Sequence, residues 1–260
     1  MHKEYLEQAL IKMQEDLFFV IKNKRSCYPT KKYPDGKKFE NGLKAKESFI
    51  RSSKFIDQIH QAVKKSFNEI NKNLNFKPKI NNTKPEEKIK GLIKFKKQDV
   101  TIRFKEFSDS LPLLVNIRSQ MSSIEKNFDT ILERAFAEVV NMRLENNNYI
   151  MGEVFLIPFY ELSKDACEKN EIKFDDKPLN FEKFFSSYNL INNREKLIDE
   201  KNNFYKCDKI CLLVVDFSLT PPKIISDFGN DKLNTDYKNL HYENFSNFLL
   251  EKYKQSINAD

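Results

Sequence analysis

This sequence of 260 residues contains no tryptophan, only five glycines and only four cysteines. So few glycines argue against a glycine-rich phosphate loop or a turn-rich β-sandwich. No apolar run approaches the roughly 20 residues that a membrane-spanning helix needs. Charges also interrupt residues 1–12, so we expect neither a signal peptide nor a membrane partner. These absences favour a cytoplasmic protein.

The cysteines are too few and too scattered to form a disulfide framework. Cys207 and Cys211 are separated by three residues, which is a spacing found in half of a zinc site. No second pair of Cys or His residues has a matching spacing. We therefore expect reduced thiols rather than a structural metal.

Charge is abundant and unevenly distributed along the chain, which carries a net charge of +7. Residues 1–97 hold 24 Lys and Arg against 11 Asp and Glu, whereas residues 98–260 hold 21 against 27. A basic first third suggests a polyanionic partner such as nucleic acid. Lysine enrichment in an AT-rich genome is the alternative explanation.

Basic residues gather in a loop predicted over residues 23–42, where Pro29, Pro34 and Gly36 interrupt regular structure. Aromatic side chains are interleaved with them, a composition that suits contacts with phosphates and bases. A solvated loop held in place by its aromatic residues is the alternative. The candidate DNA-binding residues are Lys24, Arg25, Lys31, Lys32, Lys37 and Lys38.

Hydrophobic periodicity predicts the order of elements. We expect a helix over residues 3–22, a long helix over 43–73, a connector over 74–87, and strands over 89–95, 99–104 and 113–118. Ser122 and Glu125 fit a capping box, which predicts a helix from there to about Asn146. A fourth strand is expected over residues 153–157.

The chain is expected to divide into three segments. An N-terminal helix and basic loop occupy residues 1–42, a core occupies 43–160, and a C-terminal extension packed on the core occupies 161–260. The extension is expected to contain a partly helical stretch over 181–203, a strand over 210–217 and a helix over 242–254. We expect one compact α/β (α+β) domain overall, with a mixed central sheet flanked by helices.

The predicted αβββαβ order of residues 43–159 is similar to the common core of the PD-(D/E)XK nuclease superfamily. In that superfamily an acid begins the second core strand, and an acid-x-Lys triplet lies on the third. Here Asp99 stands at the first position and Asn116-Ile117-Arg118 at the triplet. Asn116 and Arg118 face the same side of their strand because side chains alternate. Arg118 remains protonated, so it cannot act as a general base.

The block from Asn116 to Glu138 resembles a stretch of certain type II restriction endonucleases. In those enzymes the catalytic strand ends in a basic residue, Ser and Gln, and a Glu on the next helix binds metal. The resemblance implies that the catalytic residues are Asp99, Asn116, Arg118, Gln120 and Glu133, with Asp99 and Glu133 as the Mg²⁺ ligands. Glu138, Asp129 and Glu47 are alternatives to Glu133.

The resemblance implies Mg²⁺-dependent, sequence-specific hydrolysis of double-stranded DNA. Two carboxylates hold an ion that polarises the phosphate and lowers the pKa of water. A homodimer is expected, because two-fold symmetry matches a palindromic site. The Asn and Arg in the triplet motivate a second hypothesis, a catalytically silent nucleic-acid-binding protein on the same fold. A third is a protein-interaction module whose basic face reflects only lysine bias.

Overall fold

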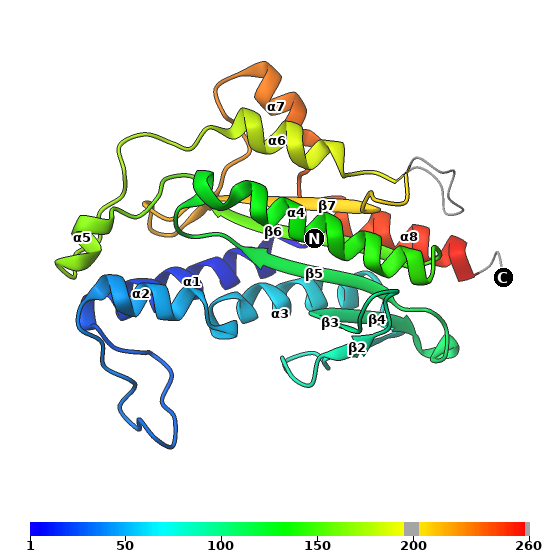
Figure 1. Ribbon diagram of the computed structural model, residues 1–260, viewed down its shortest axis with the longest axis horizontal. Coiled ribbons are helices and arrows are strands. Elements are labelled where there is room, and N and C mark those ends of the chain that lie inside the picture. Colours follow the sequence, from blue (N-terminus) through cyan, green and yellow to red (C-terminus); the bar gives the residue numbers. More distant parts are fainter. Residues whose placement is uncertain (195–202, 258–260) are drawn as a thin grey trace.

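A mixed sheet of six strands forms the centre of the protein, which a computed structural model describes over residues 1–194 and 203–257 (Figure 1). The strands lie side by side in the order β1, β4, β5, β6, β7, β8. Strands β5, β6 and β7 are parallel, and the other neighbours are antiparallel. The bounds are Leu74–Lys77 for β1, Val100–Phe104 for β4, Leu113–Ser119 for β5, Ile150–Pro158 for β6, Lys209–Asp216 for β7 and Lys223–Ile224 for β8.

Helices cover both faces of this sheet (Figure 1). One face packs against α1 (Lys3–Asn23), α2 (Gly42–Ile50), α3 (Ser53–Ile70) and α8 (Phe245–Ile257). The opposite face packs against α4 (Ile124–Glu145), α6 (Phe181–Leu190) and α7 (Asp231–Lys238), while the short α5 covers Lys164–Glu168. The α/β class with a mixed, helix-flanked sheet is therefore confirmed.

The central strands form where the sequence is continuously apolar, because a parallel strand is buried on both faces. Every residue of β6 is buried, and its side chains alternate between the two hydrophobic clusters. Helix α4 connects β5 to β6, as a parallel pair requires a crossover. The predicted strands over 99–104, 113–118, 153–157 and 210–217 are confirmed within a few residues at each end.

The strand predicted over residues 89–95 is wrong. Two short strands, β2 (Glu87–Ile89) and β3 (Lys96–Gln98), pair instead as a separate hairpin, and residues 90–95 form its tip. Opposite β5, the other neighbour of β4 is β1, which lies in the predicted connector over 74–87. With the hairpin treated as an insertion, α3 to β6 have the order helix, three strands, helix, strand.

Two predictions about helices also need correction. The single helix expected over 43–73 is two helices, because Ser52 is extended and its hydroxyl donates to the Phe49 carbonyl at 2.6 Å. The capping box of Ser122 and Glu125 does not form. Helix α4 begins after Ser123, which has a left-handed φ of 51° and makes no side-chain cap.

The C-terminal extension is closer to expectation. The predicted helix over 242–254 is α8, shifted by three residues at each end, and α6 is the helical part of 181–203. Residues 195–202 of that stretch lie outside the described part of the chain. Residues from all three predicted segments contribute to one hydrophobic cluster. All four cysteines are free thiols, and no described helix is long and apolar enough to span a membrane.

A buried ion pair joins α4 to the sheet. Arg143 lies 2.7 Å from Asp208, and both side chains are fully buried. Asp208 also accepts a hydrogen bond from the Met151 amide at 2.7 Å and lies 2.8 Å from Lys252 of α8. One carboxylate therefore connects a helix on each face of the sheet to the start of β6.

Replacing Asp208 by Ala is expected to lower the free energy of unfolding by about 3–5 kcal/mol, because it leaves the Arg143 guanidinium buried without a counter-charge. Urea denaturation of the purified protein measures the loss. Asp129→Ala is the matched control, since Asp129 pairs with Lys183 at 2.8 Å but is exposed. Equal stability changes in the two variants would contradict this account of the core.

Candidate active site

A network of charged side chains connects β5, β6 and α4. Arg118 on β5 donates from Nε to Glu153 Oε2 of β6 at 3.0 Å and from Nη2 to Glu138 Oε2 of α4 at 3.1 Å. Asn116, on the same face of β5, donates to the other oxygen of Glu153 at 3.0 Å. One guanidinium therefore bridges two carboxylates, and the Asn amide holds one of them.

Strand register explains why these side chains meet. In the parallel β5–β6 pair, Asn116 is opposite Glu153, and both lie on the face that α4 covers. Glu153 is completely buried, and this burial raises the pKa of its carboxyl group, while Arg118 acts in the opposite direction. Glu153 in turn raises the pKa of Arg118 above its usual value, followed by a smaller contribution from Glu138.

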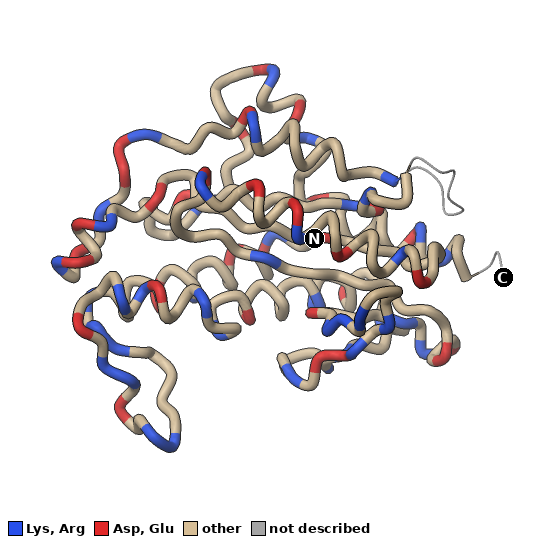
Figure 2. The backbone as a smooth tube through the Cα atoms, viewed as in Figure 1, with Lys and Arg blue, Asp and Glu red and all other residues tan. Residues whose placement is uncertain are grey.

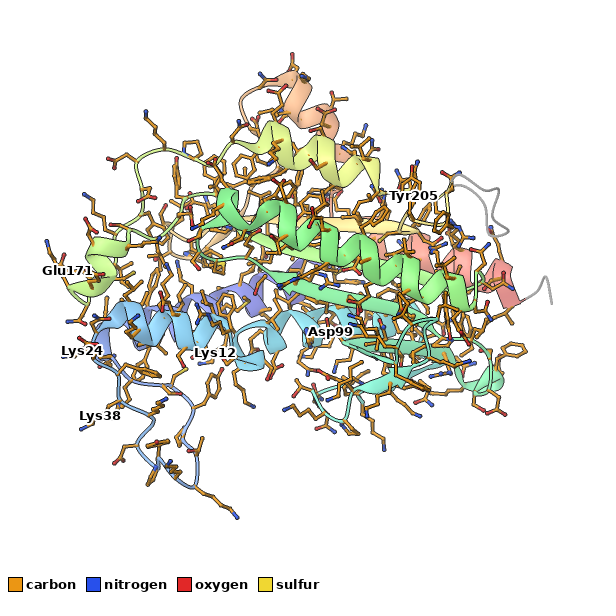
Figure 3. The ribbon with its side chains drawn as sticks, in the orientation of Figure 1. Lys12, Lys24, Lys38, Asp99, Glu171 and Tyr205 are labelled. Atoms are coloured by element: carbon orange, nitrogen blue, oxygen red, sulfur yellow. The ribbon has the colours of Figure 1, made fainter. Side chains whose placement is uncertain are left out.

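Asp99 lies between the end of β3 and the start of β4 (Figure 3). Its Oδ2 accepts a hydrogen bond from the Ile117 amide, between Asn116 and Arg118, at 2.7 Å. Burial raises the pKa of Asp99 to about 6, although the Ile117 amide and Arg118 both favour its charged form. Asp99 makes no ion pair among the described residues, whereas Arg118 pairs with both Glu138 and Glu153.

Lys96 of β3 completes the group. Its Nζ lies 3.0 Å from Glu138 Oε2, the same oxygen that accepts from Arg118. We call Lys96, Asp99, Asn116, Arg118, Glu138 and Glu153 the Arg118 cluster. Its residues come from the six-stranded sheet, from the β2–β3 hairpin and from α4.

Glu133, the predicted metal ligand, does not belong to the Arg118 cluster. It is exposed on α4, whereas Glu138 is buried and contacts Arg118. Five residues of α-helix correspond to a rotation of roughly 140°, so the two carboxylates point in different directions. Of these two acids, it is Glu138 that contacts the Arg118 guanidinium.

Asp129, Glu47 and Gln120 also make their contacts outside the Arg118 cluster. Asp129 is exposed and pairs with Lys183 at 2.8 Å, and Glu47 on α2 lies 3.7 Å from Lys44. Gln120 is buried and donates to the Ile124 carbonyl at 2.6 Å, so it holds the β5–α4 connection closed. The expected contact of Gln120 with phosphate or water is therefore not supported, because its amide group is directed toward the helix start.

The donor atoms of this cluster suit a hard cation only in part. Asp99 Oδ1 and Glu138 Oε1 take part in no hydrogen bond within the described residues. Mg²⁺ is commonly held by one or two carboxylates, with waters and substrate phosphates completing its shell. No group of three His, Cys, Asp or Glu residues in the described ranges is arranged to hold a metal. Asp99 and Glu138 thus each keep one carboxylate oxygen without a hydrogen bond, while the described residues form no closed protein site for a metal.

Sequence reasoning missed two sets of buried polar residues. Glu153 is the one acidic residue in an otherwise apolar strand. A single acid in such a strand could have indicated a buried carboxylate with a partner. Asp57, His60 and Lys64 share a buried face of α3, at helical spacing that indicates a common side. Burial lowers the pKa of His60 to about 4, and Lys64 donates to the Lys79 carbonyl at 3.2 Å. Lys64 thus fastens the β1–β2 connector to α3.

The predicted DNA-binding residues lie on a projecting segment, residues 24–41, which we call the basic arm (Figure 2). Arg25 and Lys38 form a β-bridge at its base, and Tyr28 anchors it by donating to Asp16 of α1 at 2.6 Å. Five of the six predicted basic residues are exposed, and Arg25 is half-buried with its guanidinium over the Phe19 ring. The labelled Lys24 and Lys38 lie well apart from Asp99 (Figure 3).

No protein-family model, curated protein or solved structure matches this chain. The class of this protein is therefore described from its fold and from the Arg118 cluster alone. This is an α/β protein whose mixed sheet carries a buried carboxylate network around one arginine. The arrangement of these side chains is the basis for the function proposed below.

The raised pKa of Asp99 predicts a specific pH dependence of stability. The pKa of Asp99 in the folded protein is about 6, above the ordinary value of 3.8. The protonated carboxyl group therefore stabilises the folded state fully below pH 3.8, and this stabilisation is lost as the pH rises through about 6. Asp99→Asn removes this loss. The variant's gain in free energy of unfolding is expected to be larger by about 1 kcal/mol at pH 8 than at pH 5.

Urea denaturation of both proteins at the two pH values measures the difference. Asp109→Asn, at an exposed turn position, is the control and should show no such change. A pH-independent gain for Asp99→Asn would mean that the carboxyl group of Asp99 titrates normally.

Proposed function

We propose that this protein is a Mg²⁺-dependent endodeoxyribonuclease resembling type II restriction endonucleases, which cleaves double-stranded DNA at a specific sequence. The observation that carries the proposal is that Asp99 accepts a hydrogen bond from the amide next to Arg118, while Arg118 on β5 pairs with Glu138 on the crossover helix. Lys96 also lies within hydrogen-bonding distance of Glu138. Such a site suits a reaction at a phosphodiester.

The order of elements supports this proposal. Helix α3, strands β1, β4 and β5, helix α4 and strand β6 have the order of the PD-(D/E)XK core. Asp99 precedes β4, the second strand of that order, and Asn116 and Arg118 lie on the third. The β2–β3 hairpin is an insertion between the first two strands. Asn and Arg in place of an acid and Lys remain the departure from the superfamily pattern.

The chemistry divides among the residues of the cluster. Mg²⁺ bound by Asp99 and Glu138 would supply charge neutralisation at the phosphate and a lowered pKa for water. Arg118 is permanently charged, and its planar guanidinium suits the non-bridging oxygens of a phosphate. Glu153 fixes the Nε side of Arg118 at 3.0 Å, and Asn116 fixes Glu153. Arg118 therefore enters the reaction already oriented.

The basic arm is proposed to contact the DNA backbone. Lys32 lies over the ring of Tyr33 and Lys37 over that of Phe39, at 5.4 and 5.3 Å, so aromatic rings position exposed cations. A cytoplasmic homodimer belongs to the same proposal, since a palindromic site presents each strand to one subunit. The arm and the cluster would then touch different parts of the duplex.

A catalytically silent DNA-binding protein is the second candidate. Arg118 and Lys96 both contact Glu138, so one of the two proposed metal ligands is already paired with cations. Tight, salt-dependent DNA binding without cleavage under Mg²⁺ or Mn²⁺ would favour this candidate. Discrete fragments of plasmid DNA, lost on adding a chelator, would favour the nuclease.

Two substitutions on α4 distinguish Glu138 from Glu133 as the metal ligand. Glu138→Gln is expected to lower the rate of Mg²⁺-dependent plasmid cleavage by about 100-fold or more, because it removes a metal ligand and a partner of Arg118. Glu133→Gln, five residues away on an exposed face, is the matched control and should cleave normally. Asp99→Ala should lose cleavage and retain DNA binding. Full cleavage by Glu138→Gln would refute the site.

The basic arm predicts a change in the salt dependence of DNA binding. Replacing Lys31 and Lys32 together by Gln should reduce the slope of log affinity against log salt by about one unit for each lysine that contacts a phosphate. Fluorescence anisotropy of a labelled duplex, titrated at several salt concentrations, measures the slope. The control pair, Lys232→Gln with Lys238→Gln on α7, should leave it unchanged. Identical slopes in both double variants would remove the arm from the DNA interface.

A further inference from the structure

The tip of the β2–β3 hairpin exposes three large apolar side chains. Leu92 is 55% exposed, Ile93 80% and Phe95 64%. Single exposed apolar residues are ordinary, but three within four positions form a patch that needs an explanation. They occupy residues 90–95, which we call the hairpin tip.

The hairpin tip is held rigidly by one buried residue of α4. Asn141 Oδ1 accepts from the Ile93 amide at 2.8 Å, and its Nδ2 donates to the Lys94 carbonyl at 3.2 Å. The Asn141 carbonyl accepts from the Leu92 amide at 2.9 Å. A Cβ on Gly91 would lie 2.1 Å from Asn141 Nδ2, so only glycine permits this approach. The apolar side chains are therefore displayed on a fixed backbone, as a preorganised contact surface requires.

Lysines surround the apolar side chains. Residues 86–98 contain five lysines and two glutamates, and every lysine except Lys96 is exposed. Lys88 and Lys94 make no ion pair among the described residues, whereas Lys90 and Lys97 pair with Glu145 and Glu86. An apolar patch with a cationic rim is complementary to a nucleic acid, which presents stacked bases between phosphates. The same rim disfavours a symmetric contact with a second copy, because like charges would meet.

The hairpin tip adjoins the Arg118 cluster. Asn141 lies one helical turn beyond Glu138 on α4, and Lys96, the residue after Phe95, contacts Glu138 at 3.0 Å. Asp99 follows β3 directly, which puts Phe95 roughly 13 Å from Asp99 along an extended chain. Figure 1 shows the hairpin beside β4, the strand that Asp99 precedes. A duplex whose phosphate reached the cluster would therefore have a groove within reach of the tip.

We propose that the hairpin tip inserts into a groove of duplex DNA, where Phe95, Ile93 and Leu92 pack against a base step. This inference rests on the proposed function for its ligand. Apolar wedges of this kind partly unstack the bases and bend the duplex, so the DNA would be distorted next to the cleaved phosphate. Asn141 fixes the tip to α4, so the tip would keep its position while the bases unstack.

The absence of tryptophan makes a direct test possible. Phe95→Trp introduces the single Trp of the chain at an exposed position, and acrylamide quenching reports its accessibility. Binding of a mixed-sequence duplex in the presence of a chelator should lower the quenching constant at least about twofold, because the indole stacks on bases. Leu190→Trp, on a residue that is 70% exposed at the end of α6, is the control and should stay accessible.

The outcomes separate this inference from the proposed nuclease activity. Protection of Trp in Phe95→Trp without cleavage by the wild-type protein would support insertion by a silent binder. DNA binding that leaves the Trp fully accessible would overturn insertion, whether or not the protein cleaves. Protection that grows with protein concentration in the absence of DNA would assign the tip to a contact between copies and would also overturn it.

Discussion

The pairing of Arg118 with Glu153 and Glu138 is the interaction on which the rest of the site depends. Glu153 is fully buried in the most apolar strand of the sheet, and a carboxylate is costly there without a counter-charge. Arg118 provides that charge from the neighbouring strand and contacts Glu138 of α4 through Nη2. A single guanidinium thus ties together three elements that are distant in sequence.

This pairing leaves Asp99 in a different state from the other acids. It is bonded to an amide rather than to a cation, and its raised pKa reflects burial that nothing nearby fully offsets. The basic arm and the lysine-rich hairpin add positive charge at two other places on the molecule (Figure 2).

The features that could be predicted from the sequence are those that depend on the residue pattern of a short segment. Strands β5, β6 and β7 were found because buried strands are continuously apolar, and β4 was found from its alternating pattern. Asp99 directly precedes β4, and Arg118 lies on β5. Strand β1 was missed because proline and asparagine surround four residues whose partner is 24 to 30 positions away. That Glu138 rather than Glu133 contacts Arg118 could not be predicted for a related reason. The face that α4 turns to the sheet depends on packing with β5 and β6, which periodicity alone does not fix.

The proposed function requires Asp99 and Glu138 to hold a divalent ion together beside Arg118. Anomalous diffraction from crystals of a protein–DNA complex soaked in Mn²⁺ tests this requirement. We expect a peak between these two carboxylates, at a ligand distance of about 2.2 Å, with a DNA phosphate within reach of the Arg118 guanidinium. A metal bound elsewhere, or Arg118 still closed on Glu138 with no metal beside a bound phosphate, would contradict it.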